Sequence, residues 1–305
     1  MSSPLHAAYC PDHAVLASVE VVENVPVARD TFRLRVTCAE MARRITPGQF
    51  VMLRLAGCND PLLARPLALY DTFYETTDLT SDPPAMGSPA GLDVVYLRLG
   101  KMTRRLAEYR PGQLLEIWGP LGNGFELTAK ANDIRLSHLM MVAGGIGQTP
   151  FLALAQEALG QKTYGSEPGR LPTVSRVSLC YGARSADYLA GIEDFEAAGV
   201  DVRLATDDGS RGHHGLVTDL VLDSLQGANP PDRIVCCGPE PMMAAVASLA
   251  REHAVPCFVS LETPMACGIG ICFTCVARVR DAHGGWDYKR TCVEGPVFDA
   301  SVIEW

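Results

Sequence analysis

The chain lacks any apolar stretch long enough to cross a membrane as a helix. A spanning helix needs about 20 consecutive apolar residues, and polar or charged residues interrupt every apolar run of this sequence before that length. Residues 1–11 also lack the basic start and the apolar core of a secretory signal. We therefore expect a protein of the cytoplasm that does not associate with membranes.

An excess of positive charge is also missing. Lys and Arg together number 26 and Asp and Glu number 35, which gives a formal net charge of −9. Proteins that bind nucleic acid usually carry a basic surface that neutralises phosphates, so no nucleic-acid partner is expected. The hydrophobic content of 48% and the charged content of 20% are typical of a globular protein. A length of 305 residues is enough for two domains of ordinary size and a smaller appendage.

Residues for organic catalysis are scarce. We find no paired acid and base, no nucleophile beside a base, and no motif for an oxyanion hole. The adjacent histidines His213 and His214 are expected on a loop and not at a metal. The sequence therefore offers no catalytic residue for substrate chemistry, and its function must depend on what it binds.

Cysteine, by contrast, is abundant, and four of the eleven cysteines follow a specific spacing. Cys267, Cys272 and Cys275 are arranged as C-x4-C-x2-C, and Cys292 follows after sixteen residues. This is the plant-type ferredoxin arrangement for a [2Fe–2S] cluster, in which a tight loop supplies three thiolates and a later strand supplies the fourth. The sequence therefore predicts a one-electron carrier near the end of the chain.

The residues between these cysteines favour the same interpretation. Gly268 and Gly270 allow the positive φ angles and the close approach of backbone amides that a loop around a cluster requires. Three alternatives are less consistent with the pattern. Zinc sites usually have two C-x2-C pairs, and only one is present. Disulfides are rare in the cytosol, and four unrelated thiols seldom fall at this spacing.

The other seven cysteines are irregularly spaced, and most lie within apolar segments. We expect them to be reduced and buried. They are Cys10, Cys38, Cys58, Cys180, Cys236, Cys237 and Cys257.

The first third of the chain is rich in short strand patterns separated by turns. The segment 75–91 is rich in Thr, Asp, Pro and Gly and is expected to be a long exposed loop. Six short strands at this density predict a small antiparallel barrel. The expected strands are 14–22, 31–37, 50–55, 67–70, 94–99 and 114–118.

Two segments of this barrel indicate a dinucleotide such as FAD. In Arg65-Pro66-Leu67-Ala68 an arginine opens an apolar strand and is placed to bind a phosphate. Gly100-Lys101-Met102-Thr103 follows a strand and precedes an expected helix at 104–109, where free amides would form an anion site. An ordinary strand opening and an ordinary helix cap remain alternatives for these two segments.

After residue 136 the pattern alternates between strands and helices. This alternation predicts a mostly parallel, doubly wound sheet. The segment 160–172 is polar and is expected to be a mobile loop. The expected strands are 136–143, 174–181, 200–205, 234–237 and 257–261, and the expected helices are 151–159, 186–197, 216–225 and 241–253.

The ends of these strands carry the signals for nucleotide binding. Gly144-Gly145-Ile146-Gly147 joins the first strand to the first helix, where a pyrophosphate is bound in such sheets. Cys237-Gly238-Pro239 follows a later strand at the same edge. Asp207 and Asp208 follow the third strand, and carboxylates there would repel a 2′-phosphate, which favours NAD over NADP. Ordinary turns at strand ends remain the alternative.

The predicted fold class is therefore α+β with several domains. An FAD-binding antiparallel β-barrel is expected at 12–130, an NAD-binding doubly wound α/β domain at 131–260, and a small [2Fe–2S] subdomain at 261–305. A hydride carries two electrons and an iron–sulfur cluster takes one, so a flavin between them is required on chemical grounds.

The order of these motifs resembles the ferredoxin–NADP reductase superfamily. With the cysteine motif placed after the nucleotide domain, the chain is most similar to the electron transfer subunits of the NAD-dependent type B dihydroorotate dehydrogenases. The segments that carry this similarity are Leu121-Gly122-Asn123-Gly124-Phe125, Gly215-Leu216-Val217-Thr218-Asp219, Cys237-Gly238-Pro239-Glu240-Pro241-Met242, Ser260-Leu261-Glu262, Met265-Ala266-Cys267-Gly268-Ile269-Gly270 and Gly295-Pro296-Val297-Phe298.

The resemblance implies a chain of carriers. NADH would reduce FAD, FAD would reduce the [2Fe–2S] cluster, and the cluster would exchange electrons with FMN in a separate catalytic subunit that interconverts dihydroorotate and orotate. A heterotetramer with two copies of each subunit and a role in pyrimidine biosynthesis are also implied. Cys237 would lie near the stacked nicotinamide and flavin. Ala68 and Met102 stand where this family usually has Ser and Gly.

Other functions remain open at this point. The same set of carriers would suit a subunit of a sulfide dehydrogenase, a hydrogenase or another NAD(P)H-dependent oxidoreductase. A redox-sensing binding module without turnover is a further alternative. Around the cluster, Ile269, Ile271 and Phe273 are candidates for the surface that faces a partner.

Overall fold

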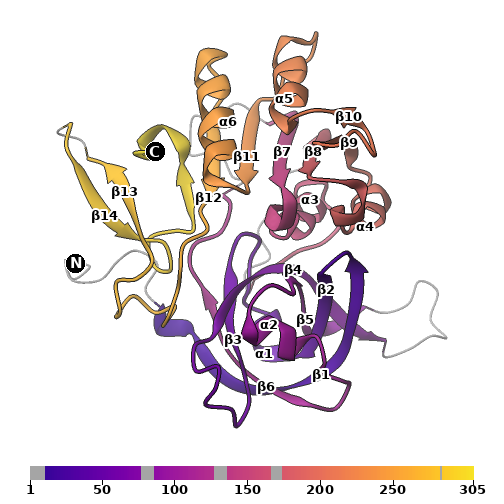
Figure 1. Cartoon of the computed structure of the whole chain (residues 1–305), viewed down its shortest axis with the longest axis vertical. Helices are drawn as coiled ribbons and strands as arrows, with labels where there is room; N and C mark the ends of the chain where they lie inside the picture. The colour runs from indigo at the N-terminus through magenta and orange to yellow at the C-terminus, as the bar shows by residue number, and fades with distance from the viewer. Residues whose placement is uncertain (1–10, 77–85, 127–135, 166–173, 282–283) are drawn as a thin grey trace.

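The computed structural model describes residues 11–76, 86–126, 136–165, 174–281 and 284–305, which form three parts (Figure 1). A closed barrel lies at the bottom of the view, an α/β sheet with its helices lies above it, and a two-stranded hairpin projects to the left. The predicted fold class is confirmed. None of the helices within these ranges is long and apolar enough to span a membrane.

The barrel consists of six antiparallel strands in the order β1-β2-β5-β4-β3-β6. Side chains alternate between its interior and its surface; in β6, for example, Leu115 and Ile117 are fully buried while Leu114 is exposed. This period of two is what the strand patterns of the sequence predict. The strands are β1 (Val15–Ala28), β2 (Thr31–Thr37), β3 (Phe50–Leu55), β4 (Arg65–Thr76), β5 (Met86–Leu97) and β6 (Leu114–Leu121).

The expectation of a long loop at 75–91 is wrong at both ends. Strand β4 continues to Thr76, strand β5 begins at Met86, and these two residues pair across the hairpin. Residues 77–85 lie outside the described residues. The register of the pairing shifts at three places along the hairpin, and each shift interrupts the regular alternation of apolar and polar residues. The strand pattern is therefore not recognisable in this polar part of the sequence.

The α/β part is a seven-stranded sheet in the order β10-β9-β8-β7-β11-β12-β15. All neighbouring strands are parallel except the last pair, in which β15 runs antiparallel to β12. Its strands are β7 (His138–Gly144), β8 (Arg176–Ala183), β9 (Asp201–Thr206), β10 (His213–His214), β11 (Arg233–Cys237), β12 (Cys257–Ser260) and β15 (Val297–Asp299).

Helices cover both faces of this sheet. Every residue of β7 is buried, since Leu139 and Met141 face one hydrophobic core and Met140 and Val142 face the other. A strand that is covered on both sides is expected to be continuously apolar. The helices of the first core are α3 (Phe151–Ala158) and α4 (Ile192–Ala197), and those of the second are α5 (Val217–Gln226) and α6 (Glu240–Glu252).

Two helix predictions need correction. The helix expected at 186–197 is a 3-10 turn (Ala186–Tyr188) followed by the shorter α4, because Gly191 between them has a φ of 72°. The helix expected at 104–109 begins earlier and is α2 (Lys101–Leu106). His213 and His214, expected on a loop, form the short edge strand β10.

The segment after α3 also differs from the expected mobile loop at 160–172. Tyr164 is only 5% exposed and belongs to the hydrophobic core of the barrel. Residues 166–173 lie outside the described residues. One aromatic residue in a polar segment gives no periodic signal, so this packing could not be read from the sequence.

The C-terminal part contains a hairpin of β13 (Val276–Arg280) and β14 (Trp286–Arg290). The chain then returns to the large sheet as β15, which the sequence did not predict. Asn123, just after the barrel, holds this return through two hydrogen bonds to the backbone of Val297, at 2.8 and 2.9 Å. The three domain boundaries remain predictions, although β15 joins a segment beyond residue 260 to the sheet of the preceding part.

Candidate cofactor sites

A pocket of about 700 Å³ lies between the barrel and the sheet. This volume is within the usual range for a small-molecule or cofactor site. The sheet contributes the turns after β7, β8, β9 and β11, because parallel strands bring their carboxyl ends to one edge. Residues that line it are Asp30, Thr31 and 97–99 from the barrel, and 144–146, 181–184, Tyr188, Ala190, Asp207, 216–218, Gly238, Pro239, Pro241, Met242, Ala245 and Glu262.

The glycine-rich turn after β7 contributes in two ways. A side chain at Gly145 would meet no atom within 4 Å, so its backbone is open to a ligand in the pocket. A Cβ at Gly147, in contrast, would lie 2.2 Å from the carbonyl oxygen of Cys237. Gly147 is therefore required for packing the turn against β11, and only Gly144, Gly145 and Ile146 of the predicted four line the pocket.

The two aspartates after β9 have different surroundings. Asp207 lines the pocket. Asp208 accepts hydrogen bonds from the backbone and the hydroxyl of Ser210, at 2.9 and 2.6 Å, and these bonds lower the pKa of its carboxyl. Asp208 thus stabilises its own turn, and of the two aspartates only Asp207 lines the pocket.

Cys237 lies beneath the pocket and not in its lining, which contains Gly238 and Pro239. Its side chain is 4% exposed, and burial raises the pKa of its thiol far above the usual range. A group with such a pKa stays protonated at neutral pH, so Cys237 is a neutral neighbour of the site.

On the barrel, β4 presents alternate residues to the surface. Pro66 and Ala68 are half-buried and face outward, whereas Leu67 and Leu69 belong to the barrel core. The guanidinium of Arg65 donates to the carbonyl oxygen of Ala64 at 3.0 Å. Pro66 and Ala68 are therefore the residues of this segment whose side chains reach the outer surface of the barrel, while Leu67 can offer only its backbone.

The anion site predicted at Gly100–Thr103 is partly occupied by the protein itself. The hydroxyl of Thr103 accepts hydrogen bonds from the amides of Leu99 and Gly100, at 3.0 and 3.1 Å. Met102 is 1% exposed in the barrel core, and Lys101 pairs with Asp60. The threonine acts as a helix cap, so one of the amides that were expected to be free, that of Gly100, already has a partner.

The four cysteines of the C-terminal motif lie in two pairs. The sulfurs of Cys275 and Cys292 are 3.1 Å apart, and Cys267 lies close enough to Cys272 to help lower the pKa of the Cys272 thiol. The hairpin explains the first pair, since Val276 pairs with Arg290 and brings the two distant cysteines together. Two pairs suit a [2Fe–2S] cluster, in which each iron takes two ligands from the protein.

The surroundings of these thiols favour their deprotonated form at two positions. The side chain and backbone of Thr274 lower the pKa of Cys272 to about 6. Hydrogen bonding to Cys292 lowers the pKa of Cys275 to about 6, and the same contact raises the pKa of Cys292. The amide of Ile269 also donates to the sulfur of Cys267 at 3.5 Å. Thiolates with amide donors are what an iron–sulfur cluster requires.

Residues 267–275, which we call the cysteine loop, pack directly on strands β3 and β6 of the barrel. The indole of Trp118 donates to the carbonyl oxygen of Cys267 at 2.9 Å, and a Cβ at Gly268 would lie 2.5 Å from the side chain of Met52. Met52 in turn pairs with Pro66 across the barrel strands. Strand β3 therefore lies between β4 and the cysteine loop. An electron that passes from a group bound at β4 to a group held by the loop would have to cross only this strand.

Sequence comparison finds two families within the chain. The family described as "Iron-sulfur cluster binding domain of dihydroorotate dehydrogenase B" matches residues 262–304, and "Oxidoreductase NAD-binding domain" matches residues 141–248. The dihydroorotate dehydrogenase B (NAD(+)) electron transfer subunit of Desulforamulus reducens is 32% identical over 92% of this chain and 94% of that protein. The chain belongs to this family of electron transfer subunits. The subunit of Geobacillus kaustophilus is 34% identical over 91% of this chain and 94% of its own length.

The fold of this chain is shared by solved structures of reductases. An NADH-dependent reduced ferredoxin–NADP oxidoreductase is 26% identical, with a TM-score of 0.72, and the match covers 100% of this chain and 92% of that one. A ferredoxin NADP+ reductase from Neisseria gonorrhoeae, with bound FAD and NADP, is 15% identical with a TM-score of 0.59. That match covers 78% of this chain and 91% of the other and shows a shared fold.

Sequence reasoning missed several residues at the pocket of this electron transfer subunit. Asp30 and Arg98 pair on the barrel rim at 2.7 Å, and Tyr188 also lines the pocket, with its ring under the guanidinium of Arg184. Arg184 itself belongs to a turn at the carboxyl end of β8 that the sequence did indicate. Leu99 is 76% exposed, as expected for an apolar residue that a ligand covers. Charged and aromatic side chains at turns have no periodic pattern, so only the packing of the barrel on the sheet brings them to one pocket.

In the part of the chain that the structure describes, the thiols outside the cysteine motif are free, as predicted. Cys180, Cys236, Cys237 and Cys257 are buried, which confirms the expectation for these four. Cys38 and Cys58 are only half-buried, and Cys10 lies outside the described residues.

Proposed function

We propose that this chain transfers electrons between NAD(H) and an FMN-containing dihydroorotate dehydrogenase subunit through FAD and a [2Fe–2S] cluster. The reaction served is the interconversion of dihydroorotate and orotate in pyrimidine biosynthesis, in a heterotetramer with two copies of each subunit. The observation that carries the proposal is identity of 32–34% to such subunits over more than nine-tenths of the chain.

The arrangement of the sites supports this order of carriers. The pocket between barrel and sheet is lined on the barrel side by the start of β2 and the end of β5, and the cysteine loop packs on β3 (Phe50–Leu55), the neighbour of β4. When bound, FAD takes up a two-electron hydride from NADH, and an iron–sulfur cluster accepts one electron at a time.

Different residues of the chain would bind NAD(H) and FAD. Gly145 exposes its backbone to the nicotinamide dinucleotide, and Asp207 hydrogen-bonds a ribose hydroxyl and disfavours a 2′-phosphate. Pro66 and Ala68 provide a surface for the flavin, and Arg65 neutralises a phosphate. The remaining candidates from the sequence would shape the sites without a direct side-chain contact that we assign to a cofactor: Leu67, Gly100, Lys101, Met102, Thr103, Gly144, Ile146, Gly147, Asp208, Cys237, Gly238 and Pro239.

The four thiols Cys267, Cys272, Cys275 and Cys292 would hold the cluster at an outer surface of the molecule. Cys272 is exposed, and the neighbouring Ile271 and Phe273 are 74% and 63% exposed. This face is where we propose that the catalytic subunit docks. A cytoplasmic location is part of the proposal, because a reducing compartment keeps free thiols reduced.

The deciding experiment is to isolate the native complex, identify the subunit that copurifies, and measure NADH-dependent reduction of orotate. We expect a partner that contains FMN and activity that depends on both subunits. A partner without FMN, or an intact complex that does not act on orotate, would contradict the dihydroorotate assignment. A sulfide dehydrogenase or hydrogenase partner would then take its place. A flavin that NADH does not reduce would favour the redox-sensing alternative.

A further inference from the structure

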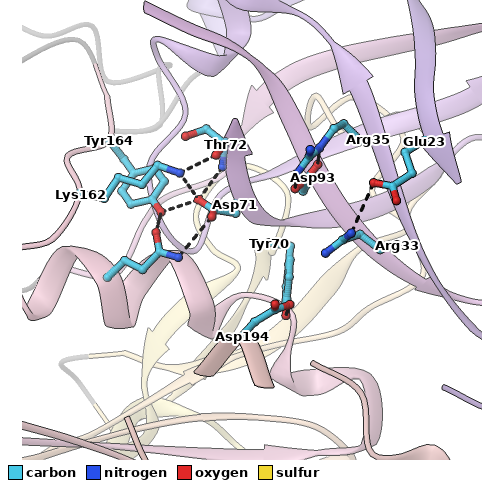
Figure 2. Close-up of polar contacts among 11 residues, drawn as sticks. Glu23, Arg33, Arg35, Tyr70, Asp71, Thr72, Asp93, Lys162, Tyr164 and Asp194 are labelled. Atoms are coloured by element: carbon cyan, nitrogen blue, oxygen red, sulfur yellow. Dashed lines mark hydrogen bonds and ion pairs between the residues drawn. The ribbon is translucent and has the colours of Figure 1, made fainter. Parts of the chain in front are cut away.

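A network of polar side chains joins the barrel to helices α3 and α4 and to the segment after α3 (Figure 2). The barrel contributes Tyr70, Asp71 and Thr72 from β4 (Arg65–Thr76), the strand whose first residues form the candidate flavin surface. The α/β part contributes Gln156 from α3, Lys162 and Tyr164 from the segment after it, and Asp194 from α4.

Asp71 is the centre of the larger half of this network. Its carboxylate lies 2.5 Å from the ammonium of Lys162, 2.7 Å from the hydroxyl of Tyr164 and 3.2 Å from the amide nitrogen of Gln156. The side chains of Lys162 and Asp71 are only 11% and 19% exposed. A pair with so little access to water is screened weakly, so its geometry is held much more firmly than that of a surface pair.

Tyr70 and Asp194 form the smaller half. The hydroxyl of Tyr70 donates to the carboxylate of Asp194 at 2.6 Å, and the tyrosine is 2% exposed. Gly191 makes room for this contact, because a Cβ there would lie 2.4 Å from the tyrosine oxygen. A partly buried, charge-assisted hydrogen bond of this length is among the stronger polar contacts in proteins.

A β-bulge allows the adjacent residues Tyr70 and Asp71 of β4 both to reach the α/β part. Consecutive residues of a regular strand point to opposite faces. Here Leu69 pairs with Val94 and Asp71 pairs with Asp93, so two steps along β4 oppose a single step along β5. Such bulges redirect side chains and occur beside active sites. This one lies two residues after Ala68.

Each part of the molecule also buries a tyrosine in the core of the other. Tyr70 of the barrel packs in the core formed by α3, α4 and the sheet, and Tyr164 packs in the barrel core. The elements that carry these contacts also reach the pocket. Helix α3 follows the turn at 144–150, and α4 follows Ala190, which lines the pocket.

We propose that Tyr70, Asp71, Gln156, Lys162, Tyr164 and Asp194 form a clamp that positions the nicotinamide-binding turn relative to the flavin strand. The clamp acts through rigid elements, since β4 carries the flavin surface at one end and the clamp at its middle. These are positioning residues that do not contact the cofactors. The inference rests on the proposed function, because hydride transfer is sensitive to displacements of about 1 Å.

The test measures anaerobic reduction of the flavin by NADH in the full-length chain loaded with FAD and cluster. Asp71→Asn and Lys162→Gln are expected to lower the limiting rate at saturating NADH at least about tenfold, since misplacement affects the chemical step. The apparent Kd for NADH should change less than about twofold, because the contacts to the cofactor remain. The long-wavelength absorption of the stacked nicotinamide and flavin should weaken in parallel.

Two comparisons separate positioning from stability. The double variant Asp71→Asn/Lys162→Gln should be no slower than either single variant, because one contact is lost in each case. Arg176→Gln is the matched control, since Arg176 pairs with Asp201 within the α/β part and both side chains are about half exposed. It should leave the limiting rate unchanged.

The inference would be overturned if the limiting rates of both single variants, measured well below their Tm, stay within about twofold of the parent. Should Asp71→Asn fail to fold, Tyr70→Phe removes one hydroxyl only, and an unchanged limiting rate in it would overturn the clamp. A parent chain whose flavin NADH does not reduce would instead contradict the proposed function, and this inference with it.

Discussion

Arg290 contacts the cysteine loop at two residues and also pairs with Glu294, which follows Cys292. Its Nη1 donates to the carbonyl oxygen of Gly270 at 3.1 Å, its guanidinium carbon lies 5.3 Å from the ring of Phe273, and its Nε donates to Glu294 at 3.2 Å. Phe273 has a φ of 56°, a conformation that is unfavourable for a residue with a side chain. The arginine therefore helps to hold a strained backbone beside the candidate cluster ligands.

Replacement of Arg290 should change the cluster and not the flavin. A positive charge near a cluster favours its reduced form, so Arg290→Met is expected to lower the reduction potential of the cluster by about 50 mV. Arg290→Lys keeps the charge and should show a smaller shift. Potentiometric titration followed by electron paramagnetic resonance measures both. An unchanged potential in Arg290→Met, with only a lower Tm, would assign the arginine a purely structural role.

Glu157 should make stability depend on pH. Burial raises the pKa of its carboxyl to about 7, although it accepts a hydrogen bond from the backbone of Tyr164. Because this pKa is higher in the folded chain than in the unfolded chain, the folded state binds more protons between about pH 4.5 and 7. The contribution of Glu157 to stability therefore falls as the pH rises through this interval and is constant above it.

Glu157→Gln should remove this dependence. We expect the variant to exceed the parent in stability at pH 8 by about 1 kcal/mol, allowing for partial screening by solvent, and to match it near pH 5. Denaturant unfolding at several pH values provides the measurement. A difference in stability that is the same at pH 5 and pH 8 would show that the carboxyl does not titrate in this interval.

At the scale of elements, the tip of the cysteine loop is an exposed apolar surface. Ile271 and Phe273 flank Cys272 and are both largely exposed, whereas Ile269 is half-buried against the barrel. Of the three residues that the sequence suggests for a partner-facing rim, two are therefore accessible. Isolated exposed apolar residues are common on proteins, but two beside a candidate electron carrier are more informative.

Charged replacements at this tip should slow electron transfer to the catalytic subunit but not reduction of the flavin by NADH. Ile271→Glu and Phe273→Glu are expected to slow electron transfer to the catalytic subunit at least about tenfold, which corresponds to about 1.4 kcal/mol of lost docking energy. Reduction of the flavin by NADH should not change. Leu114→Glu, on an exposed barrel strand, is the matched control. Equal transfer rates in all three variants would exclude this tip as the docking surface.

At the scale of the whole molecule, the cysteine loop is joined to the barrel and the sheet by separate contacts. Phe50 and Met52 of the barrel pack with Cys275 and Cys292, and β15 continues the sheet beyond β12. Loss of a cluster ligand should therefore leave the other two parts folded. The nucleotide pocket does not include any of the four cysteines.

Cys275→Ser should stop electron transfer from the flavin to the partner subunit without affecting reduction of the flavin. Iron content should fall and transfer to the partner subunit should nearly cease, because the route from flavin to partner is interrupted. Reduction of the flavin by NADH should continue at about the parent rate. Cys38→Ser, at a half-buried thiol outside the loop, is the control and should keep its iron. Full iron content in Cys275→Ser would contradict the assignment of this ligand.

Local sequence features decided much of the fold and of the candidate sites. The spacing of Cys267, Cys272, Cys275 and Cys292 is a short-range property, since three of the ligands lie within nine residues and a single hairpin brings the fourth. The barrel and the doubly wound sheet follow from periods of two and from strand–helix alternation, which neighbouring residues set. Comparison with relatives confirms the family to which these motifs pointed.

Only the tertiary structure decided which residues meet between these parts. It showed that Asp207 and not Asp208 lines the pocket, that Gly147 serves packing, and that Met102 is buried. It also revealed the bulge at Tyr70 and Asp71. These outcomes depend on contacts between residues far apart in the chain, and a strand that shifts by one residue reverses the direction of every side chain. The periodicity of the sequence predicts whether a segment is a helix or a strand. The packing of one element on another decides which of its residues meet residues from the rest of the chain.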